Sequence, residues 1–285
     1  MTGATTTYRM LVSCADRPGL VAGVSGKLFG AGANILEAQH FLDKLSDRFF
    51  MRIVFRLGNG RAPLDTAVGE FEREGMEVKL QSSADRQRIL ILVSKFDHCM
   101  VDLLYRHRTG ELDADVVGIV SNHSRDALET WLPEHIPFHH LPVTKDSKPE
   151  QEARIKQIVD ESGADLVVLA RYMQILSDDL ASFLSGRCIN IHHSFLPGFK
   201  GAKPYHQAHA RGVKMIGATA HYVTSDLDEG PIIRQEVEPV THADSPDDMI
   251  RKGRDVERRV LAAAVRDHLE QRTVIDGHRT IVFHD

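Results

Sequence analysis

Apolar and polar positions alternate with two different periods along the first part of the chain. Short segments rich in β-branched and aromatic residues predict strands, and the amphipathic segments between them predict helices. The expected elements are Tyr8–Cys14, Gly19–Ala31, Asn34–Phe41, Arg48–Leu57, Pro63–Glu74 and Glu77–Gln81. Their order, which is strand, helix, two strands, helix and strand, is that of the ferredoxin-like βαββαβ unit. We therefore predict a ferredoxin-like N-terminal domain over residues 1–82.

A second and larger α/β domain is predicted beyond a polar linker at residues 83–88, which has no hydrophobic period. Apolar strands are expected at Ile89–Val93, Asp115–Val120, Phe138–Leu141, Leu166–Leu169 and Cys188–Ile191, and helices at Met100–His107, Ala127–His135, Pro149–Ser162 and Asp178–Ser185. A long helix at Pro246–Glu270 and a strand at Thr280–Phe283 follow. This alternation predicts a doubly wound, mostly parallel sheet in residues 89–285, whose ligands bind beyond the carboxyl ends of the strands.

Composition and charge argue against several classes of function. The 285 residues are 42% hydrophobic and 26% charged, as in ordinary soluble proteins. A formal charge of −5 without any basic run argues against a nucleic-acid partner. No apolar stretch is long enough for a membrane span or a secretory signal. The cysteines Cys14, Cys99 and Cys188 are widely spaced and odd in number, so we expect no disulfide framework and a reducing, cytoplasmic location.

Polar residues gather at the end of the strand expected at Cys188–Ile191. Side chains alternate along a strand, so Asn190 and His192 are expected on the same face. An amide and an imidazole that project together can bind a carbonyl oxygen and transfer a proton. Asp228, in a downstream loop that ends in Gly-Pro, can supply a carboxylate to the same site. These residue types together indicate chemistry at a formyl or acyl carbon.

The same region resembles the formyltransferase family of folate-dependent enzymes. Residues 190–197 read Asn-x-His-x-Ser-x-Leu-Pro and residues 227–231 read Leu-Asp-x-Gly-Pro, which are two motifs of that family in the same order. The resemblance extends from about Arg88 to the C-terminus and implies a formyltransferase-type fold with Asn190, His192 and Asp228 as its catalytic triad. The residues that it implies for folate binding are Arg171, Tyr172, Met173, Gln174, Ile175, Leu176 and Gly230.

Three longer segments resemble the deformylase branch of this family: IHHSF at 191–195, GAKPYHQA at 201–208 and GATAHYVTSDLDEGP at 217–231. That resemblance implies hydrolysis of 10-formyltetrahydrofolate to tetrahydrofolate and formate, which balances the one-carbon pool and supplies formate for purine synthesis. It implies no cofactor and no metal, because the folate is the substrate. One alternative is folate-dependent formyl transfer to a small amine such as glycinamide ribonucleotide. Another, from a different class, is a non-catalytic sensor of folate or amino acids.

The loop after the first strand of the second domain favours water as the formyl acceptor. Relatives that formylate glycinamide ribonucleotide carry a Gly-rich, Asn-containing loop here, because backbone amides must approach the phosphate closely. Val93–Cys99 (VSKFDHC) contains no glycine, and Phe96 and Asp97 add bulk and negative charge. We therefore expect the phosphate position to be filled.

Two segments of the N-terminal domain, DRPGLV at 16–21 and GANI at 32–35, resemble ACT regulatory domains, which bind amino acids between copies. The resemblance implies a homo-oligomer with an amino-acid effector such as glycine or methionine. The residues expected at the regulatory site are Asp16, Gly19, Leu20, Val21, Asn34 and Ile35. The alternative is a dimerisation module without a ligand, since a fold does not determine a function.

Histidine is abundant, with sixteen residues, but its spacing does not predict a metal site. His206 and His209 lie three apart on an expected helix, and His139 and His140 are adjacent. Neither pair has a nearby carboxylate or thiolate that completes a zinc set. His193 is expected on the strand face opposite the catalytic imidazole, where a structural hydrogen bond fits better than catalysis.

Overall fold

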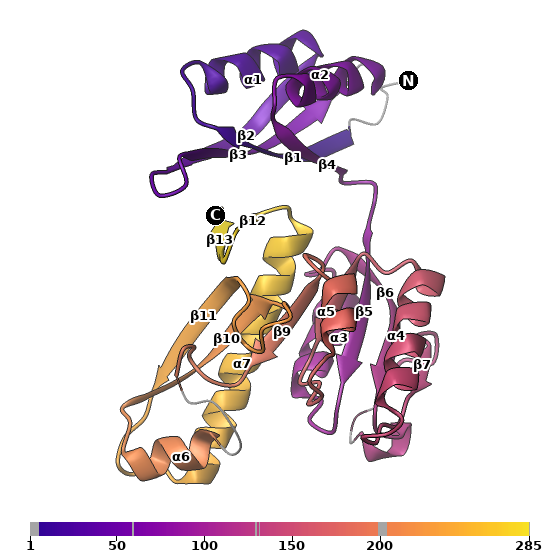
Figure 1. The fold of residues 1–285 in the computed structure, drawn as a ribbon, viewed down its shortest axis with the longest axis vertical. Helices are drawn as coiled ribbons and strands as arrows, with labels where there is room; N and C mark the ends of the chain where they lie inside the picture. The colour runs from indigo at the N-terminus through magenta and orange to yellow at the C-terminus, as the bar shows by residue number, and fades with distance from the viewer. Residues whose placement is uncertain (1–5, 59, 129, 131, 199–203, 285) are drawn as a thin grey trace. The chain divides into compact units, whose positions relative to one another are not determined.

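The computed structural model describes residues 6–58, 60–128, 130, 132–198 and 204–284. The chain divides into two compact units, which are Met1–Arg86 with Glu270–Val274 and Val282–Asp285, and Gln87–Leu269 with Ile275–Ile281 (Figure 1). This division falls within the predicted linker, but it groups two C-terminal segments with the first unit, unlike the expected second domain. Arg52 gives a physical reason: its buried guanidinium donates to the carbonyl oxygens of Glu270 at 3.1 Å and Gln271 at 3.0 Å.

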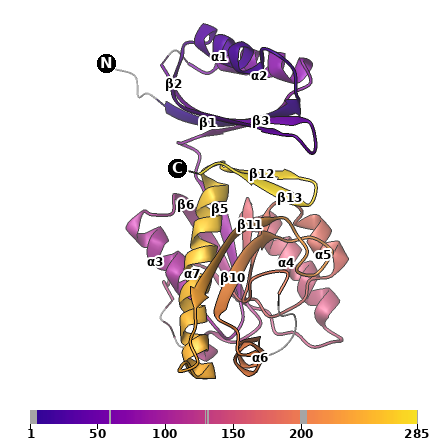
Figure 2. The same cartoon turned by 90° about the vertical axis from the view of Figure 1, so that its left-hand side faces the viewer.

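The first unit is an antiparallel sheet covered by two helices. Its elements are β1 (Thr6–Ala15), α1 (Leu20–Gly30), β2 (Ala33–Asp43), β3 (Arg48–Leu57), α2 (Ala62–Arg73) and β4 (Glu77–Ser82). The strand order is β2-β3-β1-β4, and every neighbouring pair is antiparallel. Helices α1 and α2 cover one face (Figure 2) and bury Leu28, Leu64 and Phe71 against Met10 and Ile53. The predicted ferredoxin-like unit is confirmed.

The second unit is built around a seven-stranded sheet. Its elements are β5 (Gln87–Val93), α3 (His98–Thr109), β6 (Ala114–Ser121), β7 (Phe138–His140), α4 (Lys148–Ser162), β8 (Leu166–Leu169), α5 (Asp178–Phe183), β9 (Cys188–His192), α6 (Pro204–Arg211), β10 (Met215–Tyr222), β11 (Ile232–Pro239) and α7 (Pro246–Leu269). The strand order is β11-β10-β9-β8-β5-β6-β7, parallel from β9 to β7 and antiparallel at β10 and β11. The predicted doubly wound, mostly parallel sheet is confirmed.

Both faces of this sheet are covered, which explains the continuous apolar runs of its central strands. Alternate residues of β5 belong to different cores. Ile89, Ile91 and Val93 pack on the face covered by α3 and α7. Leu90 and Leu92 pack on the opposite face with residues of α4 and α5.

The predicted helix at Ala127–His135 is wrong. The described residues of this region form a 3₁₀ turn at Arg125–Ala127 and an irregular loop, and Glu129 and Trp131 lie outside the described residues. Pro133 has no amide hydrogen and its ring clashes with the preceding turn of a helix, which explains why no helix continues here.

Three observed strands were not predicted, namely β10, β11 and β12 (Thr273–Asp276). The sequences of β11 and β12 mix charged and apolar residues without a long apolar run. Strand β12 pairs with β13 (Arg279–Val282), which corresponds to the strand expected at Thr280–Phe283. None of the helices within the described part of the chain combines the length and apolar character that crossing a bilayer demands.

Candidate active site

The candidate site lies where the sheet of the second unit reverses its strand order. Strands β5 and β8 are neighbours, and the chain continues from them toward opposite edges of the sheet. Loops at the carboxyl ends of such strands form the ligand crevice of doubly wound folds. Two hydrogen bonds join these loops. The backbone N–H of Ser94 donates to the carbonyl oxygen of Arg171 (3.2 Å), and the N–H of Met173 donates to Ser94 Oγ (2.9 Å).

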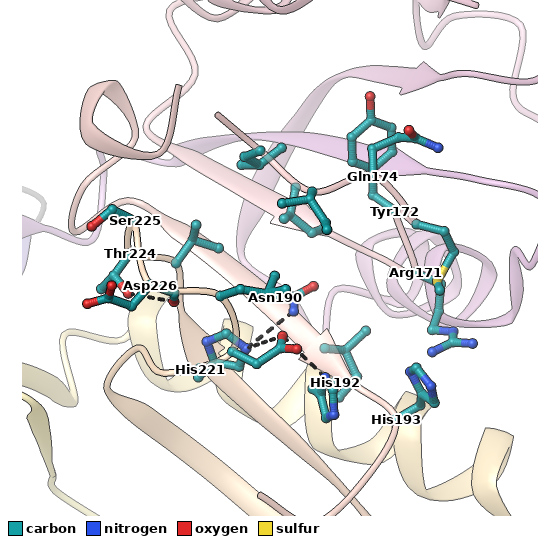
Figure 3. A pocket seen from close by; sticks show the side chains of 18 residues that line it. Arg171, Tyr172, Gln174, Asn190, His192, His193, His221, Thr224, Ser225 and Asp226 are labelled. Atoms are coloured by element: carbon teal, nitrogen blue, oxygen red, sulfur yellow. Dashed lines mark hydrogen bonds and ion pairs between the residues drawn. The ribbon is translucent and has the colours of Figure 1, made fainter. Parts of the chain in front are cut away.

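A cavity of about 290 Å³ opens at this crevice (Figure 3). The residues that follow β8, the end of β9, His221 of β10 and the loop at residues 223–228 line it. Among the lining residues are six of those predicted to bind folate: Arg171, Tyr172, Met173, Gln174, Ile175 and Leu176. Asn190, His192 and Asp228 line the same cavity, whereas Gly230 does not. The structure therefore brings the expected triad and the expected folate segment together.

Asn190 and His192 project into the cavity from β9 because of the alternation of side chains along that strand. Antiparallel pairing places His221 of β10 directly opposite Asn190. The Nδ1 atom of His221 lies 2.9 Å from the carbonyl oxygen of Tyr222, which can only accept, so this nitrogen carries the hydrogen. In the neutral ring, Nε2 is then an acceptor and takes a hydrogen bond from Asn190 Nδ2 at 3.2 Å. The amide nitrogen of Asn190 is thereby oriented, and its second N–H remains for a ligand.

Asp228 forms the carboxylate end of the constellation. Its Oδ1 lies 3.2 Å from His192 Nδ1 and 3.7 Å from His221 Nε2. Burial by itself raises the pKa of this carboxyl, but the hydrogen bond and the charge of His192 outweigh burial and hold the pKa well below its usual range. The other ring nitrogen of His192, Nε2, is buried and has no hydrogen-bond partner among the described residues. Its position at the cavity leaves Nε2 available for a bound ligand.

The turn after Asp228 explains the glycine of the second motif. Asp228 has φ of 57°, a left-handed conformation that aspartate tolerates better than most residues. Two residues later, a Cβ on Gly230 would lie 1.7 Å from the carbonyl oxygen of Tyr222 and 3.2 Å from His221 Nδ1. The backbone N–H of Tyr222 also donates to the carbonyl of Pro231 at 2.9 Å. Gly230 is thus required for close packing against β10 rather than for direct contact with a ligand in the cavity.

Comparison with known proteins decides the family. The Formyl transferase family model matches residues 87–265. A formyltetrahydrofolate deformylase of Corynebacterium sp. (strain P-1) is 47% identical over 278 residues, with 96% of each chain covered. The chain belongs to the formyltetrahydrofolate deformylase family.

Solved structures agree with this assignment. The deformylase of Burkholderia mallei is 49% identical, with a TM-score of 0.91 over 98% of this chain and 100% of that one. A glycinamide ribonucleotide transformylase of Symbiobacterium toebii is 30% identical, with a TM-score of 0.62 over 70% of this chain and 95% of that one. The fold of the second unit is therefore shared with proteins named for formyl transfer.

His221 belongs to neither of the two family motifs, yet the structure places it in contact with the expected triad. The available signal was a histidine inside the otherwise apolar strand Met215–Tyr222. Its side chain is 2% exposed, and it bonds both to Asn190 and to the backbone of its own strand. A buried imidazole with two defined partners is a positioning group for the amide that it contacts.

His193 does not occupy the place that strand alternation predicts. Strand β9 ends at His192, so alternation does not extend to His193. Its ring stacks on the ring of His192 with the centroids 5.2 Å apart, and it lines the same cavity. Burial, reinforced by the charge of Arg171, lowers the pKa of His193 to about 4. His193 is therefore neutral near pH 7.

The predicted folate segment contains both anchored and exposed residues. The hydroxyl of Tyr172 accepts a hydrogen bond from Gln151 Nε2 at 3.1 Å, and burial raises the pKa of this phenol to about 12. Met173 and Ile175 are instead 52% and 61% exposed at the cavity. Large apolar side chains left exposed beside convergent polar groups are typical of a ligand site.

One cluster with the spacing of metal ligands occurs among the described residues, and it involves neither of the two histidine pairs seen in the sequence. His98, Cys99 and Glu257 place ligand atoms within 4.8 Å of one another. The guanidinium of Arg171 lies 3.3 Å from Glu257, and burial raises the pKa of the Cys99 thiol well above its usual value. The positive charge of Arg171 repels a divalent metal ion, and a thiol that stays protonated is a poor metal ligand. Both features therefore oppose metal binding at this cluster.

The residues expected at a regulatory site lie in the first unit. A shallow cavity of about 420 Å³ is lined by Asp16, Gly19, Leu20 and Val21 together with Arg17, Ala22, His40, Leu42 and Phe49. Asn34 and Ile35 belong to β2 and do not line it. Residues 199–203, which include the start of the GAKPYHQA segment, lie outside the described residues.

Proposed function

We propose that the protein hydrolyses 10-formyltetrahydrofolate to tetrahydrofolate and formate, as the names of its relatives indicate for those proteins. The observation that carries this proposal is the His192–Asp228 pair at the cavity, beside the oriented amide of Asn190. The free Nε2 of His192 and the second N–H of Asn190 supply two donors at one cavity. Two such donors match a formyl oxygen that gains negative charge during addition.

The reaction proceeds by addition and elimination. Water adds to the formyl carbon while Asp228 accepts its proton, and the formyl oxygen receives hydrogen bonds from Asn190 and protonated His192. The bond from carbon to N10 then breaks, and His192 gives its proton to the departing nitrogen. Nε2 of His192, which faces the cavity, regains a proton from the formic acid product, and Asp228 releases its proton to solvent, so the pair is restored and formate leaves. Once His192 is protonated again, its contact lowers the pKa of Asp228, so the carboxyl returns to its ionised form.

The folate itself is expected to bind along the segment after β8. The pterin ring lies against Met173–Leu176 and bonds to backbone amides and carbonyls, and the glutamate tail extends toward solvent. The exposed Met173 and Ile175 support this placement, because they offer apolar surface at the cavity. Folate is the substrate, and the proposed chemistry needs no metal or further cofactor.

Formate release measured without any added acceptor tests the proposal. A hydrolase produces formate and tetrahydrofolate in equal amounts from 10-formyltetrahydrofolate alone. A transferase requires an amine such as glycinamide ribonucleotide, and a sensor binds the folate without turnover. Because the three possibilities differ in product, the same assay with and without an amine separates them.

We further propose that the protein forms a homo-oligomer that responds to an amino acid such as glycine or methionine. Strand β2 is an edge strand of its sheet and exposes Leu36 and Phe41, which supports association. The cavity around Asp16 and Leu20 supports an effector site in the same unit. The three described cysteines are buried and unpaired, which suits a reducing cytoplasm.

A further inference from the structure

A buried carboxylate lies beside the candidate active site and is not used by the proposed mechanism. Glu257 of α7 is 1% exposed. Three side chains from three other segments meet it. His98 Nε2 donates to Oε2 at 2.8 Å, the hydroxyl of Tyr205 donates to Oε1 at 2.7 Å, and Arg171 forms an ion pair with Oε2 at 3.3 Å. These four residues are called the Glu257 cluster below.

The sequence accommodates this cluster in a specific way. Gly253 lies one turn before Glu257 on α7, and a Cβ at Gly253 would lie 2.0 Å from the hydroxyl oxygen of Tyr205. Only glycine at this position allows the tyrosine ring to cross the helix and reach the carboxylate. The hydrogen bonds and the ion pair also lower the pKa of Glu257 despite its burial, so the carboxylate stays charged and satisfied.

The imidazole of His193 lies between the Glu257 cluster and the catalytic His192. His193 stacks on His192 at 5.2 Å between ring centroids and lies 6.4 Å from the ring of Tyr205. Arg171 lines the cavity, and Figure 3 shows it beside His193 and on the opposite side of His192 from His221. The cluster therefore lies beside His193, on the side of His192 that faces away from His221 (Figure 3).

Hydrolysis and formyl transfer differ in which nucleophile, water or an amine, reaches the formyl carbon. An amine nitrogen that replaced water would form its bond to the formyl carbon and lose its proton to Asp228, and N10 would again leave with the proton of His192. The same residues can therefore carry out the proton transfers of both hydrolysis and formyl transfer. A related fold belongs to a protein named for formyl transfer, so the difference must lie in what reaches the carbon.

We propose that the Glu257 cluster determines specificity by closing the space beside His192 to an amine acceptor, which leaves water as the nucleophile. This inference rests on the proposed hydrolase function. An acceptor needs volume and partners for its polar groups. Here the buried ring of Tyr205 takes up volume beside His193, and two hydrogen bonds and one ion pair already engage Glu257. Tyr205 is the specificity-determining residue with the clearest test, because its ring can be removed or its hydroxyl deleted separately.

The experiment supplies 10-formyltetrahydrofolate together with excess glycinamide and measures formate and formylglycinamide by mass spectrometry, with an enzyme-free sample as blank. The full-length protein should yield formate alone. Tyr205→Ala should raise the ratio of formylated amine to formate by roughly tenfold or more, which is the discrimination that one pocket side chain provides. Tyr205→Phe keeps the ring and should retain the original ratio. Tyr105→Ala, at an exposed tyrosine of α3, is the matched control.

The proposal is overturned if folded Tyr205→Ala still hydrolyses the folate and forms no more formylglycinamide than the unaltered protein. If Tyr205→Ala does not fold, His98→Ala opens the opposite edge of the cluster and is judged by the same ratio. Formylation by Tyr205→Phe equal to that by Tyr205→Ala would also contradict it, since the ring would then not be the barrier. Absence of formate from the unaltered protein would instead contradict the hydrolase function, so the two failures are distinct.

Discussion

The Nε2 atom of His221 accepts a hydrogen bond from Nδ2 of Asn190 across the β9–β10 pair at 3.2 Å. This contact orients the amide that meets the formyl oxygen. Replacing His221 with Ala should lower turnover roughly ten- to a hundred-fold, because a misplaced catalytic group loses on this scale. Folate affinity should change little.

His221→Gln can restore an acceptor and should recover part of the rate, and His278→Ala, at an exposed turn, is the control. Equal rates for His221→Ala and the unaltered protein would remove the positioning role.

Asn190 itself should matter mainly in the transition state. Asn190→Ala removes one donor to the developing oxyanion, and such losses amount to roughly a hundred- to a thousand-fold in turnover. Binding of tetrahydrofolate, measured by titration, should be nearly unchanged because the product lacks the formyl oxygen. A parallel loss of product binding and turnover would mean that Asn190 holds the folate rather than the reacting group.

Asp228 can be tested with little disturbance of the backbone. Asparagine tolerates the φ of 57° observed here about as well as aspartate, whereas alanine does not. Asp228→Asn should therefore fold normally and lose roughly a hundred- to ten-thousand-fold in turnover, the usual contribution of general acid–base catalysis. The measurements are single-turnover formate release and the midpoint of thermal unfolding. A folded variant with normal turnover would exclude Asp228 from proton transfer.

The catalytic face of β9 is predictable from local pattern, whereas the cross-strand contact is not. The two-residue period of a strand suffices to place Asn190 and His192 on one side. Their partner His221 depends on the register between β9 and β10, which is a long-range property of the fold. Alternation also fails at His193, because the strand ends one residue earlier.

Glu257 shows a second limit of sequence reasoning. A glutamate on a long amphipathic helix is normally exposed, and nothing around it in the sequence indicates burial. Its environment depends on Gly253 in the same helix and on His98, Tyr205 and Arg171 from distant segments. Helix periodicity predicted α7 nearly to the residue, but it contains no information about these partners.

The loop after β5 should not bind a phosphorylated acceptor. Phe96 lies 6.0 Å from the guanidinium of Arg171 and 5.7 Å from that of Arg254, so positive charge flanks this loop despite Asp97. Exclusion then depends on the bulk of Phe96 and on the lack of glycine amides rather than on repulsion. Glycinamide ribonucleotide in excess should neither accelerate formate release nor become formylated. Formylated ribonucleotide as the main product would contradict the hydrolase function while leaving the fold assignment intact.

His193 should make the protein sensitive to mild acid. Burial and Arg171 lower its pKa from 6.5 to about 4, although Glu257 and Asp228 act in the opposite direction. In the unfolded chain this histidine binds a proton below about pH 6.5, whereas in the folded protein it binds one only below about pH 4. The free energy of unfolding therefore falls as the pH drops through this window.

The loss expected from this residue between pH 7 and pH 5 is about 2 kcal/mol in the free energy of unfolding. Urea unfolding at both pH values measures it. His193→Gln cannot titrate, so its stability should decline less than that of the unaltered protein over the same interval, by about that amount. His206→Gln, at an exposed histidine, should follow the unaltered protein. If His193→Gln and the unaltered protein decline in parallel, His193 is not buried in its neutral form, and its stacking on His192 must be described differently.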